Sequence, residues 1–413
     1  MKKISIVYIL LLCILSGCGN QEYINDYKAN EEILSGSGYK QTETAKEKVS
    51  DDEYNYMMNN NSYITANESG LYYIALNRER IVRYYDYSGK MENVWCNKLD
   101  CKHNTSRCAA YILYQNESKY FLQYHKDKLY LMNYKDDGIY LERYDMDGSN
   151  EIRIGNLYPD DITVANVYNG RFYKDKYYYF VTDTARNRHF YMIDLMQGSK
   201  AVKLFESKDW GARKLSTYFC VNDNGILYRE GKSANEITTL KQYDIKSNQS
   251  KVILESDDQF EAECNDDIYV LKDGGVYRIE NGELVVVFED EDIQYNNCYM
   301  YINGKYIVID HRNDDGTNNA YEGQRYFYVY SIADKTMKKL DMASDCMVYN
   351  KANEKEEAKA VPSLSVIGLC NDNFYYMQSS DLKVRRVNLV SFTSGNEERE
   401  YEETITLNMG INQ

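Results

Sequence analysis

Three cysteines and one histidine lie within thirteen residues, in the pattern C-x4-C-x-H-x4-C: Cys96, Cys101, His103 and Cys108. Thiolate and imidazole groups suit zinc, and four protein ligands complete the tetrahedron of a structural site. Short spacings also close the small chelate loops that such sites use. The pattern therefore predicts one structural zinc, which would stabilise a loop too poor in apolar residues to fold alone.

A disulfide is the main alternative for this cluster if the chain is exported, because exported proteins meet oxidants. A 96–101 or 101–108 bridge would leave the third cysteine free or paired elsewhere, and it would give His103 no role. Unpaired thiols are the remaining alternative. Metal analysis and disulfide mapping distinguish the three.

The other reactive residue types are scattered along the chain. We interpret His125, His189 and His311 as strand or turn residues, because they share no spacing, and the acidic stretch Asp145–Asn150 as a hairpin turn. No hydrolase, metalloprotease or phosphate-binding motif is found, so we assign no catalytic residue. Five further cysteines are interpreted as packed core residues: Cys220, Cys264, Cys298, Cys346 and Cys370.

The first eighteen residues have the organisation of a secretion signal. Two lysines precede the apolar run Ile4–Leu15, which is too short to span a bilayer that needs about 20 helical residues. The following Leu-Ser-Gly-Cys resembles the bacterial lipobox, in which the cysteine is acylated. The resemblance implies a signal peptide over residues 1–17, lipid attachment at Cys18, and a protein anchored on the extracytoplasmic face of a bacterial cell membrane.

Composition limits the partners of the folded part. The 413 residues carry a formal net charge of −15, and no basic stripe reverses it, so we expect no nucleic-acid binding. Residues 18–60 are polar, contain Ser35–Gly38 and show no sustained period, which predicts a flexible tether.

Beyond residue 60, one pattern recurs seven times with a mean spacing of about 50 residues, as in propeller blades. Each repeat has a short run of aromatic and β-branched residues, a polar turn, and a second run that ends near an acidic residue, which are strand and hairpin signals. The leading runs start at seven positions: Leu71, Leu129, Tyr177, Ile226, Ile268, Tyr306 and Phe374.

The repeats predict an all-β fold, a β-propeller over residues 61–413 with seven four-stranded blades, with six or eight blades as the alternatives. The cysteine and histidine cluster falls in an insertion at 93–110, between the first two repeats. Strand-like patterns at 62–66 and 402–407 predict that the two ends of the domain share one blade and so close the ring.

The run Leu129–Asn133, followed by Ile139–Tyr144 and Asp145–Asn150, resembles the YWTD repeat of low-density-lipoprotein-receptor propellers, a TolB-like arrangement. The resemblance covers residues 60–410 and implies the architecture. Only one repeat keeps the motif's aspartate, at Asp310, so ligand recognition does not carry over.

These observations predict a non-catalytic binding or adaptor propeller, bound to the membrane through its lipid, for a protein or cell-envelope ligand. One alternative is an extracytoplasmic enzyme that acts on a glycan or peptide with carboxylates and tyrosines at the ring centre. Another is a scaffold subunit of a membrane transport complex. Most of the 44 tyrosines lie within the repeats, which favours blade packing over carbohydrate stacking.

Overall fold

The computed structural model describes residues 63–75, 81–105, 107–112, 121–135, 138–198, 200–208, 219–233, 236–295, 298–312, 325–341, 348–349, 359–360, 364–378, 383–395 and 401–407. These residues all belong to one compact unit, Val49–Gln413. The predicted signal peptide, Cys18, the predicted tether and Cys346 lie outside the described residues. Within the described part, no helix is long and apolar enough to cross a membrane.

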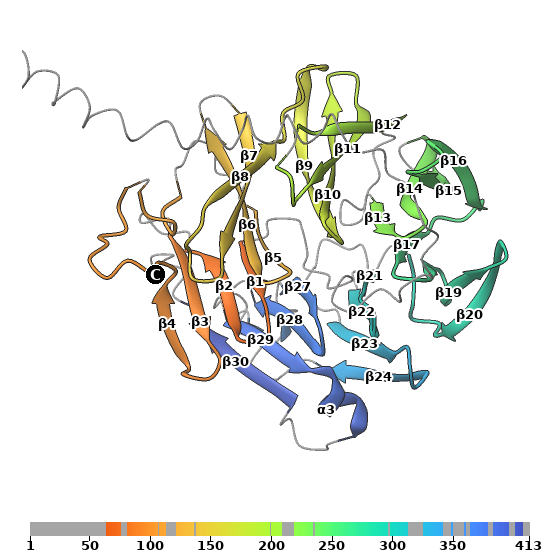
Figure 1. Ribbon diagram of the computed structural model, residues 1–413. Helices are drawn as coiled ribbons and strands as arrows, with labels where there is room; N and C mark the ends of the chain where they lie inside the picture. The colour runs from red at the N-terminus through yellow and green to blue at the C-terminus, as the bar shows by residue number, and fades with distance from the viewer. Residues whose placement is uncertain are drawn as a thin grey trace, which may run out of the picture. The chain divides into compact units, whose positions relative to one another are not determined.

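Seven four-stranded antiparallel sheets form a β-propeller, so the predicted fold class and the blade number of seven are confirmed (Figure 1). The strands of blades 1 to 3 are β1 (Ile64–Ala66), β2 (Gly70–Ile74), β3 (Val82–Asp86), β4 (Met91–Val94), β5 (Leu122–His125), β6 (Lys128–Lys135), β7 (Gly138–Asp145), β8 (Ile152–Asn156), β9 (Val164–Tyr173), β10 (Lys176–Asp183), β11 (Asn187–Asp194) and β12 (Val202–Lys208).

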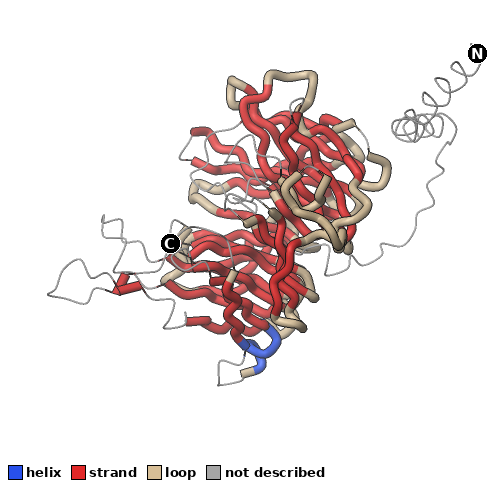
Figure 2. Tube along the Cα trace, turned by 90° about the vertical axis from the view of Figure 1, so that its left-hand side faces the viewer, coloured by secondary structure: helices blue, strands red, loops and turns tan. Residues whose placement is uncertain are grey.

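The strands of blades 4 to 7 are β13 (Phe219–Asn222), β14 (Gly225–Ser233), β15 (Glu236–Asp244), β16 (Gln249–Glu255), β17 (Glu261–Cys264), β18 (Ile268–Lys272), β19 (Gly275–Glu280), β20 (Glu283–Glu289), β21 (Cys298–Ile302), β22 (Tyr306–Arg312), β23 (Arg325–Ser331), β24 (Thr336–Asp341), β27 (Leu364–Cys370), β28 (Asn373–Gln378), β29 (Lys383–Asn388) and β30 (Glu402–Thr406). A separate two-stranded sheet pairs β25 (Val348–Tyr349) with β26 (Lys359–Ala360). Strands dominate the fold, and α3 (Leu389–Ser394) follows β29 (Figure 2).

The acidic residue that ends several second runs caps the turn between the third and fourth strands of its blade. Asp86 Oδ1 accepts a hydrogen bond from Ser88 N at 2.9 Å, and Asp194 Oδ1 accepts one from Met196 N at 2.9 Å. Asp244 Oδ1 accepts from Lys246 N at 2.8 Å in the same way. These aspartates are side-chain-capped turns, so this part of the repeat signal reports turn chemistry.

Seven hydrophobic clusters fill the spaces between the blades. Each cluster takes buried side chains from two neighbouring blades, and together they follow the ring from blade 1 to blade 7 and back. Large tyrosines such as Tyr177, Tyr179 and Tyr375 are fully buried in them. Blade packing therefore accounts for many of the tyrosines, as predicted, because a small sheet must bury its faces against its neighbours.

The predicted closure of the ring by a shared blade is wrong. β1 is the inner strand of blade 1 and pairs with β2, whereas β30 is the outer strand of blade 7 and pairs with β29. Every blade is thus contiguous in sequence. Side chains from blades 7 and 1, including Ile64 and Ile405, close the ring by packing in one cluster. Alternating strand patterns at both ends could not reveal which neighbour each strand pairs with.

A series of asparagines links the inner hairpins of blades 4 to 7. Asn222 Nδ2 donates to the carbonyl of Asn265 at 3.1 Å, and Asn265 Nδ2 donates to the carbonyl of Asn303 at 3.1 Å. Asn303 Nδ2 donates to the carbonyl of Asn371 at 2.9 Å, and Asn371 Nδ2 continues to Glu68 Oε1 of blade 1 at 3.1 Å. We name this series the asparagine relay. It supplies polar contacts between neighbouring blades in addition to the hydrophobic clusters.

Candidate functional site

The cysteine and histidine cluster lies in the connection between β4 and β5, the outer strand of blade 1 and the inner strand of blade 2. The ligand atoms of Cys96, Cys101, His103 and Cys108 all lie within 4.8 Å of one another. Ligands placed about 2.3 Å from a zinc ion at the corners of a tetrahedron are separated by about 3.8 Å. The four donors therefore converge as a metal site requires, and the cluster could hold a metal ion.

Local backbone structure brings these four side chains together. Cys101 N donates to the carbonyl of Lys98 at 3.2 Å, and Cys108 N donates to the carbonyl of Thr105 at 3.0 Å, so a turn precedes each cysteine. His103 has a φ of 53°, which is uncommon for a residue with a side chain. Its Nδ1 atom lies 3.3 Å from Cys108 Sγ. Nδ1 is therefore the nitrogen that faces the thiols.

The two neighbouring blades hold the loop in place. Trp95 is buried, stacks edge-on against Tyr144 of β7, and donates from Nε1 to the carbonyl of Met146 at 2.7 Å. Asn97 Nδ2 donates to Asp147 Oδ2 at 3.2 Å. A Cβ atom at Gly148, where φ is 82°, would lie 3.2 Å from the carbonyl oxygen of Trp95. The β7–β8 turn is therefore shaped to receive the loop.

The β7–β8 turn contains the acidic stretch Asp145–Asn150. Ser149 N donates to Asp147 Oδ1 at 2.9 Å, and Asn150 Nδ2 donates to Asp145 Oδ2 at 2.7 Å. Lys128 pairs with the other oxygen of Asp145 at 2.7 Å. Each carboxylate accepts a hydrogen bond from the turn itself, and the stretch joins the antiparallel strands β7 and β8, so the interpretation as a hairpin turn is confirmed.

Two thiols of the cluster differ in acidity. The backbone N–H of His103 lowers the pKa of the Cys101 thiol, because it hydrogen-bonds the sulfur. Burial raises the pKa of the Cys108 thiol to about 12. Cys108 lies in the hydrophobic cluster between blades 1 and 2, together with Trp95. The cluster thus joins the hydrophobic interior to the surface, with its most buried residue, Cys108, on the interior side.

A second set of charged groups lies at the ring centre and was not identified from the sequence. Arg171 of β9 forms an ion pair with Glu263 of β17, with Nη2 and Oε1 2.8 Å apart. These inner strands belong to blades 3 and 5, so the side chains meet past the inner strand of blade 4. Glu263 is 1% exposed, and burial raises its pKa to about 7. Only the assembled ring brings residues 92 positions apart into this contact.

Two further buried arginines bind backbone carbonyls between blades. Arg188 Nη2 donates to the carbonyl of Arg229 at 2.7 Å, and Arg229 Nη1 donates to the carbonyl of Phe260 at 2.7 Å. Both side chains are less than 7% exposed. Burial of a guanidinium group costs free energy unless its N–H groups are hydrogen-bonded. These bonds offset part of that cost and connect blades 3, 4 and 5.

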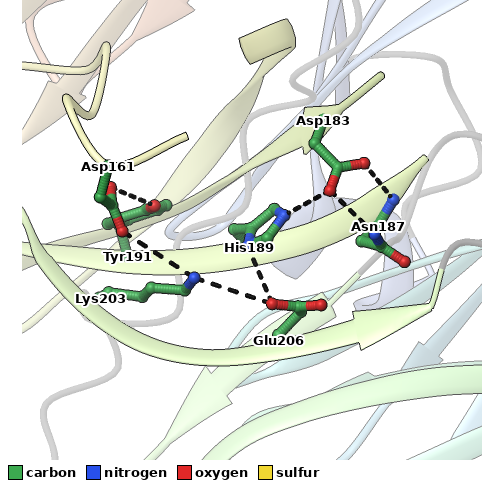
Figure 3. Close-up of polar contacts among 7 residues, drawn as sticks. All are labelled: Asp161, Asp183, Asn187, His189, Tyr191, Lys203 and Glu206. Atoms are coloured by element: carbon green, nitrogen blue, oxygen red, sulfur yellow. Dashed lines mark hydrogen bonds and ion pairs between the residues drawn. The ribbon is translucent and has the colours of Figure 1, made fainter. Parts of the chain in front are cut away.

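His189 lies in a charged network across blade 3 (Figure 3). Its Nε2 atom faces Asp183 Oδ2 at 3.0 Å, and its Nδ1 atom faces Glu206 Oε2 at 3.3 Å. Lys203 lies between Glu206 and Asp161, at 3.7 and 3.9 Å. The network connects β10, β11 and β12 with the preceding loop, and Glu206 is half exposed. It is a cross-strand polar network, consistent with a strand role for His189.

The remaining histidines also lie in strands, as predicted. His125 Nε2 lies 2.7 Å from the carbonyl oxygen of Lys174 in blade 3. His311 is buried and stacks on Tyr326 with ring centroids 4.3 Å apart. The prediction that the other cysteines are core residues is confirmed for four of them, which are buried on inner strands: Cys220, Cys264, Cys298 and Cys370.

Comparison with known proteins does not assign a family. No family model matches the chain, and no curated protein sequence matches it. Among solved structures, the chain is similar to the tricorn protease, with a TM-score of 0.47 and 10% identity over 88% of this chain and 35% of that one. An oligogalacturonate lyase from Vibrio parahaemolyticus has a TM-score of 0.45 and 11% identity, over 78% of this chain and 87% of that one.

An uncharacterized protein from Listeria monocytogenes EGD-e has a TM-score of 0.43 and 13% identity, over 68% of this chain and 80% of its own. The chain spans about a third of the length of the tricorn protease, 35%. These proteins include enzymes and a protein without an assigned role. Similarity to proteins of such different kinds does not indicate what this chain does.

Proposed function

We propose that this protein is a lipid-anchored propeller on the extracytoplasmic face of a bacterial membrane, where it binds a protein or cell-envelope ligand without catalysing a reaction. The signal-like residues 1–17 and the lipobox cysteine Cys18 support the location. The fold supports the binding role, because a closed ring of packed blades presents a rigid surface. The ring's own charges supply the observation that carries the proposal.

That observation is that the central charged groups bind other groups of the ring itself. Glu263 is buried against Arg171, and Arg229 donates to the carbonyl of Phe260. A catalytic carboxylate must reach its substrate, whereas Glu263 at 1% exposure lies within the packed centre. The central charges therefore connect blades, which favours binding on the outer surface of the ring.

One specific observation favours the enzyme alternative. Burial raises the pKa of Glu263 to about 7, and a carboxyl group with such a pKa can act as a general acid or base at neutral pH. For this function, a glycan or peptide would have to displace Arg171 from the carboxylate. Replacement of Glu263 by Gln would then abolish turnover, whereas in a binding propeller it leaves partner binding unchanged.

We further propose that the cysteine and histidine cluster binds one structural zinc ion. The donor set of three sulfurs and one imidazole nitrogen suits zinc, and protein groups would fill all four positions. No position would be left for a substrate, so the ion would only stabilise the loop. Through Trp95, the same loop contacts blade 2, so zinc would also strengthen the interface between blades 1 and 2.

Metal analysis of the purified full chain tests the zinc site. We expect one zinc per chain, lost on replacement of Cys101 by Ser or His103 by Ala and kept in the control variant Cys370→Ala, which removes a buried thiol outside the cluster. A metal-free chain with a mapped 96–101 or 101–108 disulfide would refute the zinc proposal and support the disulfide alternative.

Affinity purification of the acylated protein from its own membrane tests the binding role. One stoichiometric protein or envelope component that copurifies would support binding, and a multisubunit transport complex would specify the scaffold alternative. Turnover in a screen of glycans and peptides, abolished in Glu263→Gln, would support the enzyme alternative and contradict the proposal.

A further inference from the structure

The outer strands give each blade one free edge. β4, β8, β12, β16, β20, β24 and β30 each pair with a single strand among the described residues. An unpaired edge presents backbone N–H and C=O groups that another chain can pair with. Natural proteins block such edges with charged side chains, short strands or bulges, so the seven edges of this ring can be compared with one another.

Six of the seven outer strands carry at least one charged side chain between their first and last residues. β4 has only four residues, β8 contains an arginine and a glycine, and β30 begins with two glutamates. β12, β16 and β24 each contain at least one lysine. The protective residues are Arg153, Gly155, Lys203, Lys208, Lys251, Lys338, Lys339, Glu402 and Glu403.

β20 differs from the other six. Its sequence, Glu-Leu-Val-Val-Val-Phe-Glu, has five consecutive apolar residues and no internal charge. Val285 and Val286 are 40% and 51% exposed. The bulge at Val287 and the glutamates at the two ends limit the unprotected part of this edge to Leu284, Val285 and Val286, which pair regularly with β19. A strand of β-branched residues with one side paired and the other free is suited to accept a further strand.

We propose that the free edge of β20 (Figure 1) is a docking site for an extended peptide segment with an apolar, β-branched centre and basic residues at its ends. The inference deepens the proposed binding function by naming a class of partner, and it rests on that function. Main-chain hydrogen bonds to β20 would supply the pairing. The valine side chains would contact alternate residues of the added strand.

Charge decides what kind of segment fits. Glu283 and Glu289 end the strand, and Asp290, Glu291 and Asp292 follow directly. Opposite charges across paired strands stabilise them, whereas like charges directly opposite destabilise them. A second copy of β20, paired antiparallel about its central residue, would place Glu283 opposite Glu289 twice. The acidic ends therefore favour a partner with lysine or arginine at both ends.

Binding of a labelled peptide to the full chain tests this inference. The probe is a fluorescent heptapeptide, Lys-Val-Thr-Val-Thr-Val-Lys, and the charge control has glutamates in place of its lysines. Val286→Lys adds to β20 the protection that other edges have. The matched control is Val252→Lys on β16, because Val252 is 50% exposed, nearly the same as Val286.

We expect the lysine-ended peptide to bind wild type and Val252→Lys equally and Val286→Lys at least about tenfold more weakly. The bound peptide should also slow amide exchange at residues 284–288 of wild type. This protection would place the peptide on β20, whereas weaker binding to Val286→Lys alone could come from the charge of the new lysine. Binding that is unchanged in Val286→Lys, protection elsewhere, or no binding at about 1 mM would overturn the proposal.

Two outcomes separate this inference from the function on which it rests. If Val286→Lys still copurifies a stoichiometric partner from the membrane, the binding role stands and the β20 site is wrong. If wild type instead forms a concentration-dependent dimer that Val286→Lys abolishes, a second copy occupies the edge and the basic peptide is refuted as partner.

Discussion

Replacement of Asn303 by Ala tests whether the asparagine relay holds the ring together. Asn303 is 1% exposed, and its Oδ1 accepts from Tyr306 N at 2.8 Å and Lys305 N at 2.9 Å. Its Nδ2 donates to the carbonyl of Asn371 in blade 7 at 2.9 Å. The alanine variant leaves the buried N–H of Tyr306 without its partner, at about 1–3 kcal/mol, and removes one hydrogen bond between blades, at about 1 kcal/mol.

The free energy of unfolding should therefore fall by about 2–4 kcal/mol. Urea denaturation measures it, and the denaturant dependence should stay unchanged, because the surface exposed on unfolding is the same. Asn224→Ala is the matched control, since Asn224 lies exposed in the corresponding turn of blade 4 and should change stability by less than about 0.5 kcal/mol. Equal losses in the two variants would refute the structural role of the relay.

Asn303→Asp separates the two parts of this effect. The carboxylate keeps the acceptor for Tyr306 and Lys305 but loses the donor to Asn371, and it places negative charge against that carbonyl oxygen. A loss as large as that of the alanine variant would assign most of the energy to the contact between blades. Stability near that of wild type would assign it to the turn.

Three further outcomes are expected. Glu263→Gln should remove a pH dependence of stability. The folded pKa of Glu263 is raised from 4.5 to about 7, so the stability of wild type relative to the variant should fall by about 3 kcal/mol as pH rises through that window. Urea denaturation at a series of pH values measures this difference. Asp183→Asn should show the opposite pH dependence, because His189 and backbone donors lower the pKa of Asp183. The greater stability of wild type should be present above about pH 4 and should be lost as pH falls. Trp95→Phe removes the hydrogen bond to Met146 and should speed release of the proposed zinc ion to a chelator, measured by absorbance. An unchanged release rate would count against a role of this contact in holding the loop.

The repeat could be predicted from sequence because an apolar run recurs in every blade and a turn-capping aspartate follows in several of them. Runs such as Tyr177–Phe180 form the buried second strand, and residues such as Asp194 and Asp244 cap the turn before the outer strand. Both signals depend on neighbours within a few residues. The spacing therefore gave the correct blade number, although the YWTD aspartate is kept only at Asp310.

Contacts between blades could not be predicted in this way. Arg171 and Glu263 lie 92 positions apart, and neither belongs to a recognisable motif. The relay residues also look like ordinary turn asparagines, because the same side chain that caps its own turn donates to the next blade. The cysteine and histidine cluster is the exception, since its four residues lie in one short loop and local spacing sufficed to bring them together.

The interface between blades 7 and 1, which closes the ring and is called the closing seam, shows the same distinction between contacts that are local in sequence and contacts that are distant. A blade shared by both ends would close the ring with a ladder of main-chain hydrogen bonds, whereas here blades 7 and 1 meet through side chains. Tyr87 donates to the hydroxyl of Tyr375 at 3.2 Å, and the guanidinium group of Arg386 lies 4.1 Å from the centre of the Tyr87 ring. The seam is thus of the same kind as the other six interfaces. Each blade can complete its strand pairing from contiguous sequence, and ring closure then depends on how well the last pair of faces packs.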